Sequence, residues 1–234
     1  MTAAPQFPPL LQGRHTAGQV PFIAACAAAR DGCDAGLILY DASADLAAAM
    51  VLAPEVPLAK AAAMLPLAEV GLQNALGALA PPELPVQMDW TGGIRVNAGL
   101  CGHFRIAAAP TDPDRVPDWL VVGFDLRFLP GPDAPGSTPD TTALYAEGCG
   151  DLAPADLLEA WARHTLAWLH RWEEEGMAPL HREWSGIVIG IGQPITVAGA
   201  RGTFLGLDEH LGLLLKTQGT TRAIPLHALL EDRT

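Results

Sequence analysis

Three helices can be predicted from the spacing of apolar positions along the chain. Residues 18–32 and 57–79 carry apolar side chains at helical spacing, and Pro66 is expected to kink the second helix or to separate its first turns. A helix over 153–176 is the clearest, because its apolar residues recur every three or four positions and Gly176 then stops it. That stripe comprises Leu157, Trp161, Thr165, Trp168 and Trp172.

Short apolar and β-branched runs between these helices predict strands. A buried-looking strand at 35–40 precedes a second one at 46–55, which Pro54 ends. Residues 131–140 have the composition of a loop. Four further strands are expected at about 86–90, 94–97, 100–108 and 118–129.

The pattern changes after Trp184, where five short strands are separated by Gly-containing turns and no helix is expected. This pattern is typical of a small five-stranded barrel. We therefore place a domain boundary near Ser185 and expect two domains, 1–184 and 185–234. The proline-rich residues 1–14 are expected to form a surface arm.

Composition limits the classes of function. The chain has 234 residues and a formal net charge of -12, so nucleic acid and anionic membrane surfaces are poor partners for it. Neither a signal peptide nor an apolar run long enough to span a bilayer is found in the sequence. These features predict a cytoplasmic protein.

The cysteines and histidines do not have the spacing of a metal site. The four cysteines are scattered without a C-x-x-C pair, which indicates reduced thiols and argues against zinc cages and disulfide frameworks. His164, His170 and His181 show no metal-ligand spacing either. We predict no metal site.

Five strings, in order along the chain, resemble motifs of the biotin/lipoate A/B protein ligase family. They are MDWTGGI (88–94), GLCGHF (99–104), VVGFDLRF (121–128), TTALYAEG (141–148) and GTFLGLDEHLGLLLKT (202–217). The first two are similar to the family's Lys-Trp-Pro-Asn-Asp and Lys-Leu-Ala-Gly-Ile-Leu motifs. The resemblance implies an α/β (α+β) fold, a mixed β-sheet flanked by helices, with a small C-terminal SH3-like β-barrel.

The resemblance also implies a chemistry. Members of the family hold biotin or lipoate beside ATP, form an acyl-adenylate and pass the acyl group to a lysine of a carrier protein. That reaction needs fixed cations and hydrogen-bond donors where charge develops on the phosphate. The family supplies them with a Gly-Arg-Gly-Arg loop and one lysine.

This sequence departs from the family at those places. Only DASAD (41–45) joins the two strands between which the Gly-Arg-Gly-Arg loop should lie, and Gly99 falls where the family has its lysine. The early Ser-Thr-Asn motif falls on 20–22, Val-Pro-Phe, and the Pro-Asn-Asp of the tryptophan motif falls on 91–93, Thr-Gly-Gly. These substitutions predict that the adenylate-forming loop and the ligase lysine are lost and make ATP a doubtful cofactor.

Strand alternation suggests residues that take the place of the missing loop and lysine. If 100–106 is a regular strand, Cys101, His103 and Arg105 share one face and form the floor of a pocket, or they belong to a partly solvated sheet face. We take these three as candidate catalytic residues; Cys149 is a second candidate nucleophile. The candidate ligand-binding residues are Trp90, Gly92, Gly93, Gly99, Gly102, Asp125 and Arg127.

Three functions are compatible with these residues. The first is a ligase-like pseudoenzyme that binds a small carboxylic acid or acyl group, such as a biotin- or lipoyl-like compound, without activating it. The second is an acyl or cofactor transferase resembling the octanoyltransferases, with altered catalytic residues. The third is a non-enzymatic interaction module. An acyl or biotinyl carrier protein is a candidate partner for the first two.

Overall fold

The computed structural model describes residues 4–131 and 140–231. The strands of the large sheet are β1 (Gln12–His15), β2 (Leu37–Asp41), β3 (Leu46–Leu52), β4 (Val86–Asp89), β5 (Gly93–Val96), β6 (Gly99–Ala109), β7 (Trp119–Leu126) and β8 (Val188–Ile189). The helices are α1 (Pro21–Arg30), α2 (Leu58–Ala61), α3 (Met64–Leu79), α4 (Pro154–Glu175) and α5 (Met177–Ile187), with 3-10 turns η1 (Leu144–Glu147) and η2 (Leu226–Leu229). A second sheet contains β9 (Pro194–Val197), β10 (Ala200–Leu207), β11 (Leu213–Thr217) and β12 (Thr220–Ile224).

The large sheet is mixed, as expected. Its strand order is β1-β2-β3-β7-β6-β5-β4-β8. The outer pairs β1–β2 and β4–β8 are parallel, and the pairs between them are antiparallel. The long strands β6 and β7 lie at its centre and pair over eight residues, from Gly102 opposite Leu126 to Ala109 opposite Trp119.

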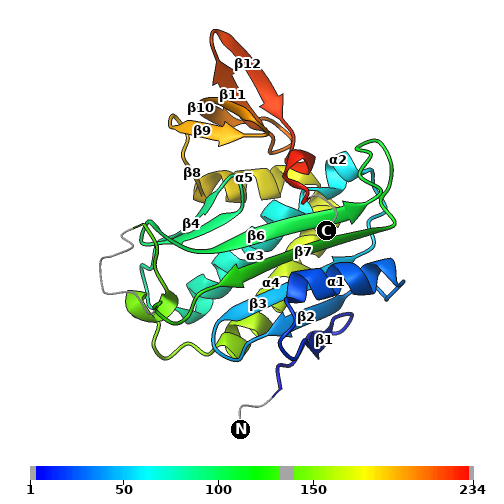
Figure 1. Ribbon diagram of the computed structural model, residues 1–234, viewed down its shortest axis with the longest axis vertical. Helices are drawn as coiled ribbons and strands as arrows, with labels where there is room; N and C mark the ends of the chain where they lie inside the picture. Colours follow the sequence, from blue (N-terminus) through cyan, green and yellow to red (C-terminus); the bar gives the residue numbers. More distant parts are fainter. Residues whose placement is uncertain (1–3, 132–139, 232–234) are drawn as a thin grey trace.

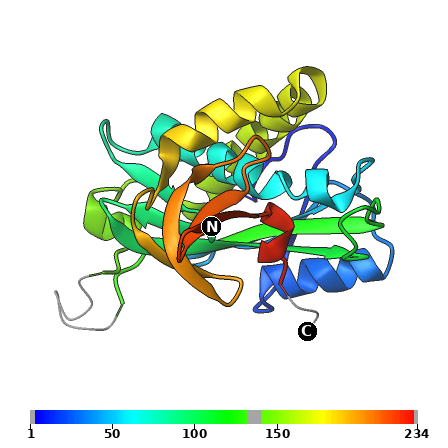
Figure 2. The ribbon, with the colours of Figure 1, turned by 90° about the horizontal axis from the view of Figure 1, so that it is seen from above.

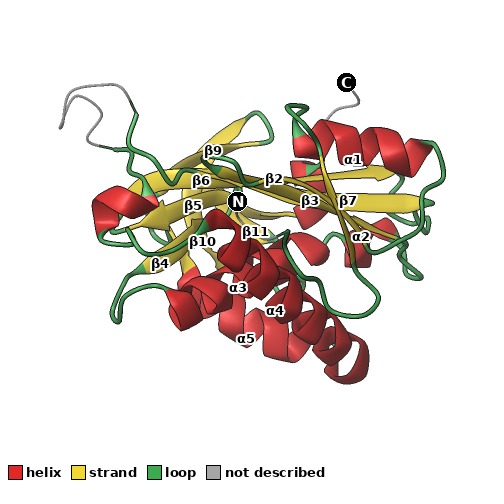
Figure 3. Cartoon of the chain, turned by 90° about the horizontal axis from the view of Figure 1, so that it is seen from below, coloured by secondary structure: helices red, strands yellow, loops and turns green. Residues whose placement is uncertain are grey.

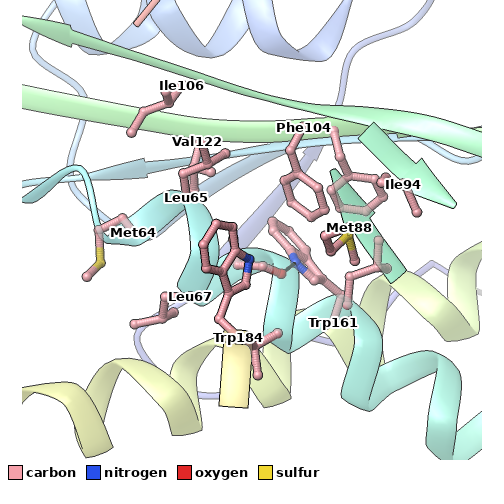
Figure 4. Close-up of a cluster of buried hydrophobic side chains, with 14 of the residues drawn as sticks. Met64, Leu65, Leu67, Met88, Ile94, Phe104, Ile106, Val122, Trp161 and Trp184 are labelled. Carbon is pink, nitrogen blue, oxygen red and sulfur yellow. Dashed lines mark hydrogen bonds between the residues drawn. The ribbon is translucent and has the colours of Figure 1, made fainter. Parts of the chain in front are cut away.

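Helices α3, α4 and α5 cover one face of this sheet, as Figures 2 and 3 show from above and below. The main core lies between them, and Figure 4 shows the indoles of Trp161 and Trp184 packed beneath Phe104 and Val122 of the sheet. Glu69 of α3 is fully buried in this apolar layer, where its Oε2 accepts a hydrogen bond of 2.5 Å from Trp184 Nε1. Its other carboxylate oxygen has no partner within the described residues.

Helix α1 lies on the opposite face and covers only part of it (Figure 3). It packs on β2, β3 and β7 through a second, smaller apolar cluster that includes Leu39, Val51 and Val121. Among the described residues, no helix covers the region of this face toward β4, β5 and the first half of β6. We call this uncovered region the open face.

The second sheet is antiparallel, with the order β12-β11-β10-β9 (Figure 1). It contains four of the five expected strands, because Val188–Ile189 joins the large sheet beside β4. Helix α5 runs through Ser185 without a break, so the division into domains 1–184 and 185–234 stays a prediction.

The predicted elements before this point are found with shifted ends. The helix expected over 57–79 is interrupted at Ala62 and Ala63, so that Pro66 lies in the first turn of α3, where its missing N–H costs little. The expected surface arm includes an edge strand, β1, and residues 132–139 of the expected loop lie outside the described residues. No helix in the described ranges combines the length and apolar character that crossing a membrane requires.

Candidate functional site

His103 and Arg105 of β6 and Asp125 of β7 lie on the open face. His103 is directly opposite Asp125 in the antiparallel register. Side chains alternate along a strand, and Ala107, two residues after Arg105, packs in the α1 cluster. The face predicted for His103 and Arg105 is therefore the one that the structure gives them, with Asp125 beside them.

Arg105 is held by two carboxylates. Its Nη2 lies 3.3 Å from Asp125 Oδ1, and its Nε lies 3.5 Å from Glu231 Oε1. The C-terminal segment that carries Glu231 is itself attached to β6: Leu230 pairs with Ile106, and the Glu231 N–H donates to the Ile106 carbonyl at 2.9 Å. The Arg105 guanidinium is thus already paired with two carboxylates of the protein.

A small hollow of about 190 Å³ adjoins this cluster. Arg105 and Asp125 form one side of it, and the N-terminal turn of α1 forms the other. The hollow is lined by Val20, Pro21, Phe22, Ala47, Arg105, Phe124 and Asp125. The three positions that align with the family's Ser-Thr-Asn motif therefore lie at the predicted site, although their side chains are apolar.

His103 is partly buried at the rim of the open face, beside Gly92 and Gly93. Gly93 is opposite His103 in the β5–β6 register, and a side chain on Gly92 would lie 2.6 Å from the Phe104 carbonyl oxygen. Gly92 has a φ of +96°, a conformation that favours glycine. Burial lowers the pKa of His103, with Arg105 adding to this effect and Asp125 opposing it. A neutral imidazole at pH 7 can donate or accept a hydrogen bond here.

Cys101 does not join this cluster, and the prediction that it shares a face with His103 and Arg105 is wrong. The β5–β6 register places Ile94 opposite Gly102 and Arg95 opposite Leu100, so Cys101 is the extra residue of a β-bulge. Its side chain is fully buried in the main core, and its Sγ lies 3.4 Å from the Arg127 carbonyl oxygen. The bulge resets the alternation that the prediction had assumed.

Neither candidate nucleophile has the properties of a reactive thiol. Burial raises the pKa of Cys101 to about 12, with Arg127 opposing the effect, and burial together with Glu147 raises the pKa of Cys149. A nucleophilic cysteine needs a lowered pKa and access to substrate. Both thiols have the opposite environment, which disfavours the thiol-dependent transferase.

Two of the predicted ligand-binding glycines lie in closed surroundings. A side chain on Gly102 would collide with the Asp125 carbonyl oxygen, so this glycine permits β6 and β7 to approach. A side chain on Gly99 would lie 2.9 Å from the Thr142 Cβ, because the chain at Asp140–Thr142 is hydrogen-bonded alongside Leu100. Gly99, which is predicted to fall where the family has its lysine, therefore faces a neighbouring segment of the chain and not an open pocket.

Trp90 also has a structural role rather than the predicted contact with ligand. Its side chain is buried in the main core, and its indole Nε1 donates a 3.0 Å hydrogen bond to the carbonyl of Leu211, between β10 and β11. Arg127 follows the end of β7, where its backbone N–H donates to the Cys101 carbonyl at 2.9 Å. These contacts fix the edges of the site and do not line it.

The turn between β2 and β3 is short and held by carboxylates. Asp41 Oδ1 accepts hydrogen bonds from the Ser43 N–H at 3.0 Å and the Ser43 hydroxyl at 2.6 Å. Asp45 Oδ1 accepts from the N–H groups of Phe128 and Leu129, at 2.8 and 3.2 Å. The turn predicted to fall at the family's Gly-Arg-Gly-Arg loop is thus short, and its two aspartate side chains accept hydrogen bonds from the protein.

Two acidic residues of the site were missed by sequence reasoning. Glu231 reaches Arg105 from the end of the chain, and no local pattern indicates this contact. Asp89 of β4 binds Arg95 of β5, with 3.0 Å between the Oδ1 and Nε atoms. Two opposite charges six residues apart in the 86–97 hairpin are a signal that could have indicated this contact. No group of three His, Cys, Asp or Glu side chains in the described part of the chain is arranged to hold a metal ion.

Comparison with known proteins places this chain in a family. Residues 7–186 match the model of the biotin/lipoate A/B protein ligase family, and residues 191–232 match that of a domain of unknown function, DUF4444. A biotin--[acetyl-CoA-carboxylase] ligase of Paracoccus denitrificans is 24% identical over 189 residues, which cover 77% of this chain and 78% of that protein.

Solved structures agree with this match. A biotin protein ligase-like protein of unknown function from Silicibacter sp. TM1040 is 55% identical, with a TM-score of 0.92 over 98% of this chain and 100% of that one. The biotin protein ligase of Aquifex aeolicus has the same fold at 16% identity, with a TM-score of 0.70 over 86% of this chain and 90% of that one. This chain belongs to the biotin/lipoate A/B protein ligase family.

Proposed function

We propose that this protein binds a small carboxylic acid or acyl group in the hollow between α1 and Arg105 and does not adenylate it. Two of the family's functional segments, aligned on this chain, line that hollow: residues 20–22 and, through Arg105, the strand at 99–105. The turn at 41–45 leads directly into β3, whose Ala47 also lines it. The Paracoccus relative carries the name of a biotin ligase, which supports a ligand of this chemical class.

The observation that carries the proposal is the Asp41–Asp45 turn. Adenylation places an ATP phosphate among fixed donors and cations, and losing one such donor costs roughly 10²–10³ in rate. Here both aspartates at the turn accept hydrogen bonds from the protein itself, and neither residue offers a positive charge. A phosphate brought to this turn meets acceptors and negative charge, which disfavours its binding.

The acid is expected to bind by exchange. Arg105 is the guanidinium that lines the hollow, and Glu231 occupies its Nε edge at a side-chain exposure of 43%. An incoming carboxylate can take the place of Glu231, because an exposed ion pair is worth little and is easily broken. The neutral His103 nearby supplies a hydrogen bond without adding charge.

The test has two parts. ATP–pyrophosphate exchange with biotin, lipoate and octanoate should give no rate above that of a blank, and isothermal titration with the same acids should detect binding. Arg105→Met should weaken that binding at least fivefold, while Arg201→Met, an exposed arginine of the second sheet, should not. Acid-dependent exchange well above the blank would show that the chain adenylates after all, and silence in titration with all three acids would refute the ligand class.

A further inference from the structure

A second cavity, of about 670 Å³, lies on the helix-covered side of the large sheet, away from the open face. Met50 of β3 and Val122 of β7 form its base, and both point into the main core. Its inner wall consists of side chains that are almost fully buried: Met50, Ala61, Met64, Leu67, Val122 and Thr165. The cavity therefore enters the space where sheet and helices separate.

The mouth of this cavity is formed by three segments that are distant in the sequence. These are the N-terminal arm at Leu10 and Leu11, the loop 52–56 after β3, and the last turns of α4 around Leu166 and Leu169. Leu10 is 75% exposed although it lies at the entrance of an apolar cavity. An apolar side chain left in water there is available to cover an apolar ligand.

Of the residues that the structure describes, the mouth of the cavity carries one lysine without a carboxylate partner and two glutamates. Lys60 of α2 lies with its Nζ 5.2 Å from the centre of the Trp172 ring, and no carboxylate in the described ranges is within ion-pair distance of it. Glu173 is paired with His170 at 3.7 Å, and Glu55 lies on the loop at the entrance. The ammonium of Lys60 keeps its charge available, because an aromatic ring satisfies it only weakly.

We propose that this cavity binds an amphiphile with a long apolar chain and a terminal carboxylate. The chain lies against Met50, Met64 and Leu67, and the carboxylate meets the Lys60 ammonium at the mouth. The volume is within the range of roughly 300–1,000 Å³ found for small-molecule sites, whose walls are mostly apolar with few polar groups. This site is separate from the hollow at Arg105 and does not depend on the function proposed for that hollow.

Displacement of cis-parinaric acid, a fluorescent fatty acid, tests the proposal on the full-length protein. Dodecanoate should displace the probe, and dodecanol and dodecylamine should do so less well. Lys60→Met should weaken dodecanoate about fivefold, the scale of a solvent-exposed ion pair, and leave dodecanol unchanged. Equal affinities for acid, alcohol and amine, unaltered in Lys60→Met, would overturn the assignment of the head group.

A pair of substitutions on α4 tests the location. Leu166→Trp fills the cavity and should weaken both dodecanoate and dodecanol more than tenfold, whereas Ala167→Trp places the same indole on the exposed side of the helix and should change neither. Undiminished binding by a folded Leu166→Trp protein would overturn the location.

A measurement on the unsubstituted protein keeps the location testable if that variant does not fold. A diazirine-labelled fatty acid should cross-link to peptides that contain 52–56 and 166–173. Cross-links confined to 93–105 would place the chain on the open face and overturn the proposal, and no labelling at all would overturn it too.

Discussion

The two faces of the large sheet are built from the same strands by different means. Along β6, Phe104 and Ile106 point to the helix-covered face and are buried, while His103 and Arg105 point to the open face and are partly exposed. One face is held by contiguous apolar packing under three helices. The opposite face has a smaller apolar cluster under α1, and its open part carries ion pairs, among them Arg105–Asp125 and Arg95–Asp89.

The difference shows where stability and ligand recognition are expected to lie. Burial of apolar area gives roughly 25 cal/mol per Å², whereas exposed ion pairs contribute little. The helix-covered face should therefore determine whether the chain folds. The open face should tolerate changes in its charged residues.

The largest effect is expected from Trp161→Ala. Trp161 is fully buried on α4, stacks edge-on against Phe124 and donates a 3.1 Å hydrogen bond to the Ala68 carbonyl. The substitution should lower the free energy of unfolding by about 3–5 kcal/mol, measured by urea denaturation. Val116→Ala, at a position that is 46% exposed, is the control and should change it by less than ~0.5 kcal/mol. A loss of less than ~1 kcal/mol in Trp161→Ala would contradict the larger contribution to stability expected of the helix-covered face.

A smaller, pH-dependent effect is expected at Glu69. Burial raises the pKa of its carboxyl from 4.5 to about 8, partly offset by the hydrogen bond from Trp184. The folded chain keeps a proton there that the unfolded chain has already lost, so this contribution to stability is complete below about pH 4.5. It decreases as pH rises through about 8.

Glu69→Gln should remove this dependence. Between pH 5 and pH 8.5, the wild-type free energy of unfolding should fall relative to that of the variant by up to roughly 4 kcal/mol. The comparison must be between the two proteins, because His103 and His227, whose pKa values are lowered, produce a trend of opposite sign at lower pH. Parallel pH profiles would show that Glu69 is ionised inside the core.

The smallest effect on stability is expected at Arg105. Its side chain is 36% exposed and its carboxylate partners are more so, which allows water to screen both ion pairs. Arg105→Met and Glu231→Gln should each change the free energy of unfolding by less than ~1 kcal/mol in urea denaturation. A loss above ~2 kcal/mol in either variant would mean that the open face also supports the fold.

The contrast between the faces explains what could be predicted from the sequence. Apolar spacing placed α4 within one residue of its observed ends and β3 and β7 within three, because the helix-covered face imposes that spacing. Alternation also placed His103 and Arg105 correctly. It failed at Cys101, because a bulge depends on how two strands pair and the sequence of one strand alone does not show it. The contact of Glu231 with Arg105 was missed because it joins residues 126 positions apart, and local patterns in a single sequence do not report contacts at that separation.

The hydrogen bond from Trp90 to Leu211 has a consequence for how the chain can be divided. The indole lies in the main core, and its acceptor belongs to the loop between two strands of the second sheet. Cutting the chain after α5 would leave that N–H without its acceptor in an apolar interior. It would also expose the apolar side chains around Trp90 to water. The second sheet therefore covers Trp90, and a protein shortened after α5 should aggregate more readily than the full-length protein.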